Sequence, residues 1–360
     1  MPAFPTPGAT PREELGLAIV EGQGAVQGTI GDKLLGGLGI NWRNAHMVKA
    51  TLGGSLGLRH IGSSKYVRAQ GTEYQRMSAT FGDALLTVTP RGVEIVVPRE
   101  MVLDYGNRFD VLSFFAGRFG QEIGILTQEY LIAAATIGSG SIYVAGSAAN
   151  SGVAYTAANR DVLGASGMNP IQDILASIRR IIASGERPDT VVMSGPVWYR
   201  VSTCQNTLQF VRGTYSAIAE VNLENFTSVL KPYGIKQVLI GDNYYNSAAD
   251  GATPSLTAIW SNTYILVCRA GNTGSSEDVT EGVSVPTLSG IGANVFWNGF
   301  DSSGMPSLSK DAHDFTGAGG YYVEQYPDLT RKAEVLRIEM SHNPTITNNR
   351  AGDLIATQYS

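Results

Sequence analysis

The stretch at residues 185–202, GERPDTVVMSGPVWYRVS, has the residue types of a catalytic strand-to-turn junction. A run of strand-forming residues ends at Ser194, and a Gly-Pro pair then begins a second element. In open α/β sheets, ligands bind beyond the carboxyl ends of the strands, which is where this hydroxyl would lie. Nucleophilic catalysis by a serine requires a histidine base and an acid to orient it. Ser194 is therefore the first candidate for a catalytic residue.

The rest of the sequence gives little support to an enzyme. It contains no phosphate-binding loop of the G-x-x-x-x-G-K-[ST] type, no H-E-x-x-H, no C-x-x-C and no G-x-S-x-G. The four histidines are scattered and lack metal-ligand spacing: His46, His60, His313 and His342. Catalytic triads assemble in space, so an α/β enzyme with a site near Ser194 stays open as an alternative. We expect a strand-end turn at Ser194, with no catalytic residue, no cofactor and no metal.

Composition excludes several other classes. The chain has 360 residues, of which 43% are hydrophobic and 16% charged, so it can bury more than one core. Its net charge of −5 does not fit a protein that binds nucleic acid through a basic surface. Cys204 and Cys268 have no metal or disulfide spacing, and we expect both to be small buried hydrophobes in a reducing cytoplasm. We recognise no secretory leader and no membrane span.

The first hundred residues divide into an arm and a long hairpin. Residues 1–45 begin with four prolines within the first 14 positions and continue rich in glycine, which indicates an extended arm with one short helix near residues 31–38. Residues 46–98 contain short β-type runs separated by glycine, and they predict a long two-stranded loop. Residues 41–82 carry six cations and the single anion Glu73, a net charge of +5 that leaves −10 for the remainder. The cations are Arg43, Lys49, Arg59, Lys65, Arg68 and Arg76.

A helical stripe follows the hairpin. Ten apolar residues recur at alternating spacings of four and three, which predicts one continuous helix over residues 104–137. Asp104 would cap its start and Gly138 would end it. Internal glycines argue against a free coiled coil and favour close packing on a sheet or a neighbour. The stripe consists of Tyr105, Phe109, Leu112, Ala116, Phe119, Ile123, Leu126, Tyr130, Ala133 and Ile137.

The second half begins with a compact α/β lobe. NPIQDILASIRRIIASG predicts a helix with Asn169 as its cap, Pro170 in its first turn and Gly185 at its end. TVVMS predicts a strand, and NLENFTSVLKPYG predicts a helix capped by Asn222. The chain closes with a long strand, a turn and a final strand, which we expect to lie in the sheet beside the long helix.

This order of parts resembles the major capsid proteins of tailed bacteriophages, the Hong Kong 97 capsid fold family that encapsulin shells share. The junction VEIVVPREMVLDYGNRF is similar to the family's passage from loop strand to spine helix. The segment NPIQDILASIRRIIASGERPDTVVMSGPVWYRV is similar to its axial helix–strand pattern, and VLRIEMSHNPTITNNRAGDLIATQ to its closing peripheral strand. The resemblance covers residues 85–355 by motif and the arm and loop by order.

The resemblance implies an α+β fold with four parts. They are an N-terminal arm (1–45), an extended hairpin loop, the E-loop (46–98), a peripheral domain with the spine helix (99–164 and 328–360) and an axial domain (165–327). It further implies a virion protein, assembled in the host cytoplasm, whose pentamers and hexamers form an icosahedral shell around packaged double-stranded DNA without reading its sequence. A separate scaffolding protein, a portal and a decoration protein would be partners. An encapsulin-type compartment is the alternative within the same fold.

Two sets of residues are then expected to act in assembly. Arg59, Lys65, Arg68 and Arg76 of the hairpin would meet acidic residues of a neighbouring subunit. The spine residues would pack the long helix against the C-terminal strands: Tyr105, Phe109, Leu112, Phe119, Ile123, Leu126 and Tyr130.

Overall fold

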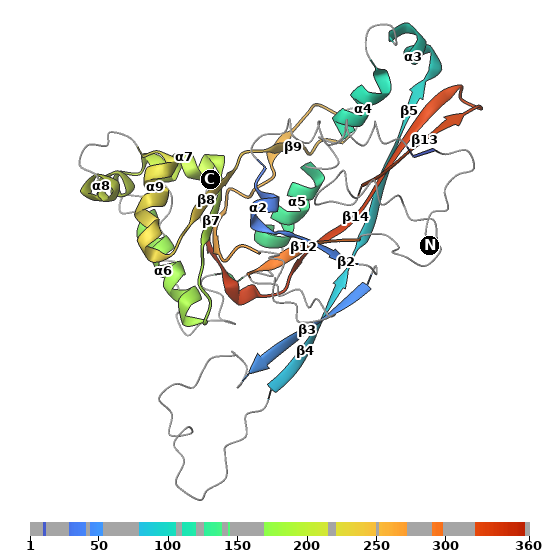
Figure 1. Ribbon diagram of the computed structural model, residues 1–360. Helices are drawn as coiled ribbons and strands as arrows, with labels where there is room; N and C mark the ends of the chain where they lie inside the picture. Colours follow the sequence, from blue (N-terminus) through green and yellow to red (C-terminus); the bar gives the residue numbers. More distant parts are fainter. Residues whose placement is uncertain are drawn as a thin grey trace, which may run out of the picture.

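The structure, a computed structural model, describes residues 10–11, 29–40, 44–52, 79–105, 110–119, 126–138, 143–144, 169–214, 221–249, 252–271, 290–297 and 321–356. Two sheets organise these residues (Figure 1). A five-stranded sheet with four helices beside it forms a compact axial lobe. A six-stranded peripheral sheet extends away from that lobe, and a separate two-stranded hairpin projects from the junction.

The axial lobe has the mixed sheet order β6-β15-β11-β7-β8. β7 (Thr190–Ser194) runs parallel to β8 (Gln237–Gly241) and antiparallel to β11 (Tyr264–Cys268). β15 (Gly352–Ala356) pairs with β11 and with the short β6 (Tyr143–Val144). The helices are α6 (Pro170–Ala183), α7 (Gly195–Thr203), α8 (Gln205–Thr214) and α9 (Leu223–Leu230), the last followed by the 3₁₀ turn η5 (Lys231–Tyr233).

Local sequence determines where two of these helices begin and end. The Asn169 side chain accepts a hydrogen bond from the Gln172 backbone N–H at 3.2 Å, and Asn222 caps α9 in the same way through Asn225 at 2.8 Å. Gly185 follows α6 with a φ of +96°, a conformation that glycine adopts without steric cost. These caps confirm the boundaries that the sequence predicted.

Both faces of the axial sheet are covered, which explains why β7 is apolar throughout. Side chains alternate along a strand, so Val191 and Met193 face the core beneath α6, α7 and α9, while Val192 faces the opposite core. The opposite core is formed with α2 (Gly31–Leu34) and α5 (Gln128–Ala133), which lie between the lobe and the peripheral sheet (Figure 1). All five residues of β7 are buried.

The peripheral sheet is built around one long strand, β14 (Ala333–Ile346). Its first part pairs with β13 (Tyr321–Asp328) on one side and β5 (Thr89–Pro98) on the other. Its last part pairs with β12 (Gly292–Trp297), which runs parallel to β2 (Gly37–Ile40). β1 (Thr10–Pro11) adds to β13.

The second strand of the hairpin ends at Thr87, earlier than the predicted end at residue 98. β3 (Asn44–Leu52) and β4 (Ala79–Thr87) form its antiparallel ladder, from Asn44 opposite Thr87 to Leu52 opposite Ala79. The boundary at residue 98 was wrong, because β5 belongs to the peripheral sheet through its pairing with β14. Alternation along a sequence identifies a strand but not its partner, and this partner lies more than 200 residues away.

The prediction of one continuous helix over residues 104–137 was also wrong. The described residues form α3 (Arg99–Tyr105), α4 (Val111–Phe119) and α5, which continues into a π-helical turn (Ala134–Gly138). Asp104 is the penultimate residue of α3 and so does not begin a helix. Instead, the Asp110 carboxylate accepts hydrogen bonds from the Leu112 N–H at 3.0 Å and the Ser113 hydroxyl at 2.7 Å, and so starts a new helix. The end at Gly138 is as predicted.

The final strand lies in the axial sheet and not beside the spine. After β14, the 3₁₀ turn η6 (Asn349–Ala351) redirects the chain, and β15 enters between β6 and β11. Residues 352–356 therefore belong to the axial sheet, although the sequence placed them in the peripheral domain. A small hairpin of β9 (Tyr244–Asn246) and β10 (Leu256–Ala258) completes the described elements.

Candidate functional site

The predicted spine residues are divided between several environments. Leu112 is half-buried in α4, and Leu126 packs against the core shared by α2, α5 and the axial sheet. Tyr130 is 43% exposed, with its ring edge against Tyr245 at a centroid distance of 5.1 Å. Tyr105 and Phe119 are the last residues of α3 and α4, and Phe109 and Ile123 lie outside the described residues. Of the three predicted spine residues whose side chains the structure describes, Leu126 packs in that shared core, whereas Leu112 is half-buried and Tyr130 is exposed.

The predicted basic contacts of the hairpin, Arg59, Lys65, Arg68 and Arg76, lie outside the described residues. The structure describes the two strands that precede and follow them in the chain, β3 and β4. The β3–β4 ladder leaves both sheets and points away from them (Figure 1). Leu85 of β4 is 53% exposed.

Ser194 occupies the end of β7 as a buried turn residue. It is 1% exposed, and its hydroxyl donates a hydrogen bond to Asn262 Oδ1 at 2.7 Å. Among the side chains that the structure describes, His342 is the only histidine, and it lies in β14 of the peripheral sheet. The hydroxyl thus holds the α7 turn to the loop before β11.

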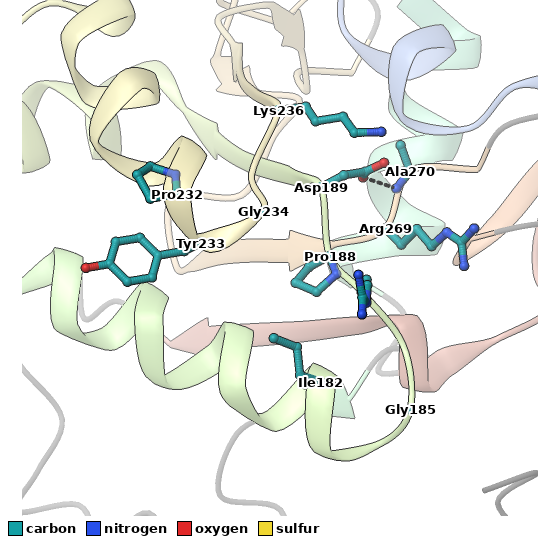
Figure 2. Close-up of a pocket in the computed structure, with 11 residues that line it drawn as sticks. Ile182, Gly185, Pro188, Asp189, Pro232, Tyr233, Gly234, Lys236, Arg269 and Ala270 are labelled. Carbon is teal, nitrogen blue, oxygen red and sulfur yellow. Dashed lines mark hydrogen bonds between the residues drawn. The ribbon is translucent and has the colours of Figure 1, made fainter. Parts of the chain in front are cut away.

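A pocket of about 820 Å³ opens at the opposite end of the same sheet (Figure 2). It lies where β7 and β8 begin and β11 ends, between the end of α6 and the η5 turn. Substrate sites of α/β enzymes form at the carboxyl ends of parallel strands, so this pocket lies at the wrong end for such a site. In the described part of the chain, no cluster of His, Cys, Asp and Glu could hold a metal ion, and no helix is long and apolar enough to cross a membrane.

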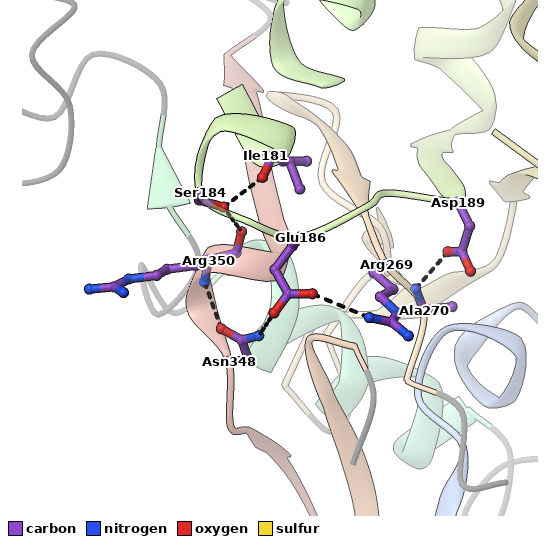
Figure 3. A network of polar contacts seen from close by, with 8 residues as sticks. All are labelled: Ile181, Ser184, Glu186, Asp189, Arg269, Ala270, Asn348 and Arg350. Atoms are coloured by element: carbon purple, nitrogen blue, oxygen red, sulfur yellow. Dashed lines mark hydrogen bonds and ion pairs between the residues drawn. The ribbon is translucent and has the colours of Figure 1, made fainter. Parts of the chain in front are cut away.

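A polar network beside the pocket joins three segments that are distant in sequence (Figure 3). Glu186, between α6 and β7, accepts a hydrogen bond from Asn348 Nδ2 at 2.8 Å and pairs with Arg269 at 3.3 Å. The Ser184 hydroxyl donates to the Ile181 and Arg350 carbonyls. The network holds the turn between β14 and β15 against the end of α6.

A buried ion pair fixes β15 under α6. Asp353 is 1% exposed and accepts hydrogen bonds from Ser177 Oγ at 2.5 Å and from Arg180 at 3.0 and 2.6 Å. Burial raises the pKa of Asp353, and the contacts with Arg180 and Ser177 oppose that rise. These contacts hold β15 against α6 at a fixed position along the helix.

Glu129 of α5 lies where the end of the N-terminal arm, the spine and the axial lobe meet. Its carboxylate accepts hydrogen bonds from the Ile30 N–H at 2.9 Å, the Gly31 N–H at 2.7 Å and Trp260 Nε1 at 2.6 Å. Burial raises the pKa of Glu129, while these donors oppose the rise. A Cβ at position 31 would lie 2.5 Å from Glu129 Oε2, so a larger residue there would displace this carboxylate.

Backbone bonds extend this joint along the end of the arm. Gly36 N–H donates to the Gly271 carbonyl at 2.9 Å, and Gly271 N–H donates to the Leu34 carbonyl at 2.9 Å. The Asn294 N–H of β12 donates to the Gly36 carbonyl at 3.0 Å. Residues 30–36 are therefore bonded to the spine, to the axial lobe and to the peripheral sheet.

The far end of the peripheral sheet exposes large apolar side chains. The N–H of Arg99, at the start of α3, donates to the Lys332 carbonyl, which places α3 beside the β13–β14 turn. Leu103 in α3 is 74% exposed, and Leu329 in the turn is 81% exposed. On the sheet itself, Glu94 pairs with Arg337, which lowers the pKa of that carboxyl. Leu103 and Leu329 are therefore apolar surface that the described part of the chain leaves uncovered.

His342 is buried at the root of the hairpin, where β14 leaves β5 and joins β12. It lies opposite Thr89 on one side and Phe296 on the other, and it is 3% exposed. Burial, and secondarily the positive charge of Arg91, lowers the pKa of His342 to about 4 from 6.5. The imidazole is therefore neutral in the folded chain at neutral pH.

Acidification should weaken the fold through His342. Between pH 6.5 and about 4 the unfolded chain binds a proton that the folded chain excludes, so stability falls as the pH falls. The loss should reach about 3 kcal/mol near pH 4, at about 1.4 kcal/mol for each unit of pKa shift. Urea unfolding of the unassembled protein at pH 7 and pH 4.5, compared with His342→Asn, measures this contribution. Parallel pH dependences of the two proteins would contradict it.

No known protein-family profile and no curated protein matches the sequence. Solved structures do match. A phage-related protein from Bordetella bronchiseptica RB50 superimposes with a TM-score of 0.61 at 17% identity, over 96% of both chains. The putative capsid protein of a prophage of E. coli CFT073 gives 0.51 at 11% identity, over 97% of this chain and 99% of that one. The capsid of cyanophage P-SCSP1u gives 0.51 at 12% identity, over 92% and 89%. The chain therefore has the α+β, Hong Kong 97-like fold of phage capsid proteins, as its sequence motifs predicted.

Proposed function

We propose that this protein is the structural subunit of the icosahedral capsid of a tailed bacteriophage, assembling into pentamers and hexamers around packaged double-stranded DNA. The observation that carries the proposal is the shared fold, which spans more than nine-tenths of this chain in comparison with phage capsid proteins. The exposed apolar end of the peripheral sheet and the projecting hairpin support it, because both are surfaces that a lone subunit leaves uncovered.

Purification of the expressed protein tests this proposal directly. A shell subunit should elute from size-exclusion chromatography as capsomers or as megadalton particles, and negative-stain microscopy should show closed shells. A small soluble oligomer under all conditions would contradict the proposal. Particles from infected cells should contain DNA, whereas protein cargo in place of DNA would indicate an encapsulin-type compartment.

The virion is the proposed location, with assembly in the host cytoplasm. A scaffolding protein, a portal and a decoration protein are the proposed partners, in addition to other copies of the chain. The DNA would be enclosed without sequence-specific contacts. The net charge of −5 favours a shell that does not condense its genome by neutralising phosphates.

The hairpin is proposed to lie on a neighbouring subunit, with Arg59, Lys65, Arg68 and Arg76 facing acidic residues there. A two-stranded ribbon is marginally stable alone in water, so it needs a surface on which to lie. Residues 41–82 carry a charge of +5, which complements the −10 of the remaining chain. Each exposed ion pair contributes only about 0–1 kcal/mol, but the contact repeats at every subunit.

Reversal of three of these charges should block or weaken shell closure. The triple variant Lys65→Glu, Arg68→Glu, Arg76→Glu should fold as the wild type does but yield few closed particles by electron microscopy. High salt should reproduce part of the defect by screening the charges. The corresponding glutamine variant is the control, and its defect should be smaller. Normal empty shells that fail only to retain DNA would instead indicate that these residues bind the genome.

A further inference from the structure

The pocket at the base of the axial sheet has an excess of positive charge. Arg187, Lys236 and Arg269 line it, together with the single carboxylate of Asp189. Arg269 is paired with Glu186 at 3.3 Å. Arg187 and Lys236 are exposed, and neither has an ion-pair partner among the described residues. Two cations of the pocket lining are therefore available to a ligand, and one of them, Lys236, can be seen in Figure 2.

The same pocket offers a hydrogen-bond acceptor and apolar walls. Asp189 Oδ1 accepts hydrogen bonds from the Ala270 N–H at 2.8 Å and the Thr190 hydroxyl at 3.0 Å, while Oδ2 accepts none from the described part of the chain. Pro188 and Pro232 form part of the wall, and Ile182 and Tyr233 are large side chains that stay 52% and 43% exposed there. The ligand should thus combine negative charge, an N–H donor and apolar groups.

These features distinguish between classes of anionic ligand. A free phosphate would meet the Asp189 carboxylate and leave the apolar wall uncovered. Duplex DNA is too wide for a pocket of about 820 Å³. A peptide with acidic side chains can place carboxylates on Arg187 and Lys236, a backbone N–H on Asp189 and an apolar side chain against Ile182.

We propose that this pocket binds an acidic, extended peptide segment of a second copy of this chain. The proposal rests on the proposed function, because a shell of identical subunits presents each pocket to neighbouring copies of the same sequence. Charge complementarity supports that occupant: the lining carries three cations and one carboxylate, whereas the whole chain has a net charge of −5.

The first test is binding of a fluorescently labelled hexaglutamate peptide to unassembled capsomers, followed by anisotropy. The double variant Arg187→Glu, Lys236→Glu should lose at least tenfold in affinity. Arg179→Glu, Lys231→Glu is the matched control, since both residues are exposed on the same lobe, neither lines the pocket and the change in charge is equal. Control binding should stay within twofold of the wild type. Equal losses in the two variants would overturn the pocket as the binding site.

The second test is the yield of closed particles, counted by electron microscopy, from the same three proteins. The pocket variant should assemble several-fold less than the control variant, with an unchanged melting temperature. If it assembles as the control does but fails to bind hexaglutamate, the occupant is not a second copy. Failure of the wild type to form any particle would contradict the proposed function instead, and the peptide assay would still test the pocket.

Discussion

Replacement of Glu129 by alanine should lower the free energy of unfolding by about 4 kcal/mol. The change leaves three buried donors, the Ile30 and Gly31 N–H groups and Trp260 Nε1, without their acceptor. Each buried polar group that loses its partner costs about 1–3 kcal/mol. The loss should appear as a lower urea midpoint with an unchanged dependence on denaturant, because the surface exposed on unfolding is nearly the same.

A second variant at position 129 separates the loss of the negative charge from the loss of side-chain volume, and a variant at another glutamate serves as the control. Glu129→Gln keeps an acceptor oxygen but turns an NH₂ group toward a donor, so it should lose less than Glu129→Ala. Glu100→Ala, an exposed glutamate in the first turn of α3, is the control and should stay within about 0.5 kcal/mol of the wild type. If Glu129→Ala is as stable as this control, the carboxylate does not hold the lobes together.

The second large effect is expected at Asp353. Asp353→Ala removes one partner of a buried pair, the carboxylate that accepts from Ser177 and Arg180, which should cost about 3–5 kcal/mol. A double-mutant cycle measures the coupling of the pair. It compares the free energies of urea unfolding of Asp353→Ala, Arg180→Ala and the variant that carries both changes. The double variant should be more stable than the sum of the single losses predicts, because it leaves no unpaired charge.

Arg179→Ala is the matched control for this cycle, since Arg179 precedes Arg180 on α6 but is exposed. It should change stability by less than about 0.5 kcal/mol. A comparably small effect of Asp353→Ala would mean that the ion pair with Arg180 does not stabilise the packing of β15 under α6.

Elements with strong local determinants could be predicted closely. Asn169, Pro170 and Gly185 define α6 because capping and turn geometry depend on neighbouring residues alone. The apolar run at β7 was recognised for the same reason. The helical stripe shows the limit of such patterns, because its spacing continues past Asp110, where the side chain caps a new helix.

The two most important buried carboxylates were missed. Glu129 follows Leu126 by three residues and precedes Ala133 by four, so it lies on the apolar face of its helix, and a charge there was a detectable anomaly. Its partners could not be inferred, because they lie 98, 99 and 131 residues away in sequence. Asp353 offered no comparable pattern, and its partner Ser177 is 176 residues distant.

The sequence by itself determined the order of the parts, the caps and strands of the axial lobe, and the resemblance to phage capsid proteins. These depend on spacing and on residues close together in the chain. Only the tertiary structure decided which strands pair, that β5 leaves the hairpin for β14, that β15 enters the axial sheet, and that Glu129 joins the arm to both lobes. It also showed that Ser194 is buried and hydrogen-bonded to Asn262, and that a basic pocket lies at the other end of the sheet. The reason is physical: strand pairing and the burial of charge are long-range, and a strand or a lone carboxylate does not specify its partner locally.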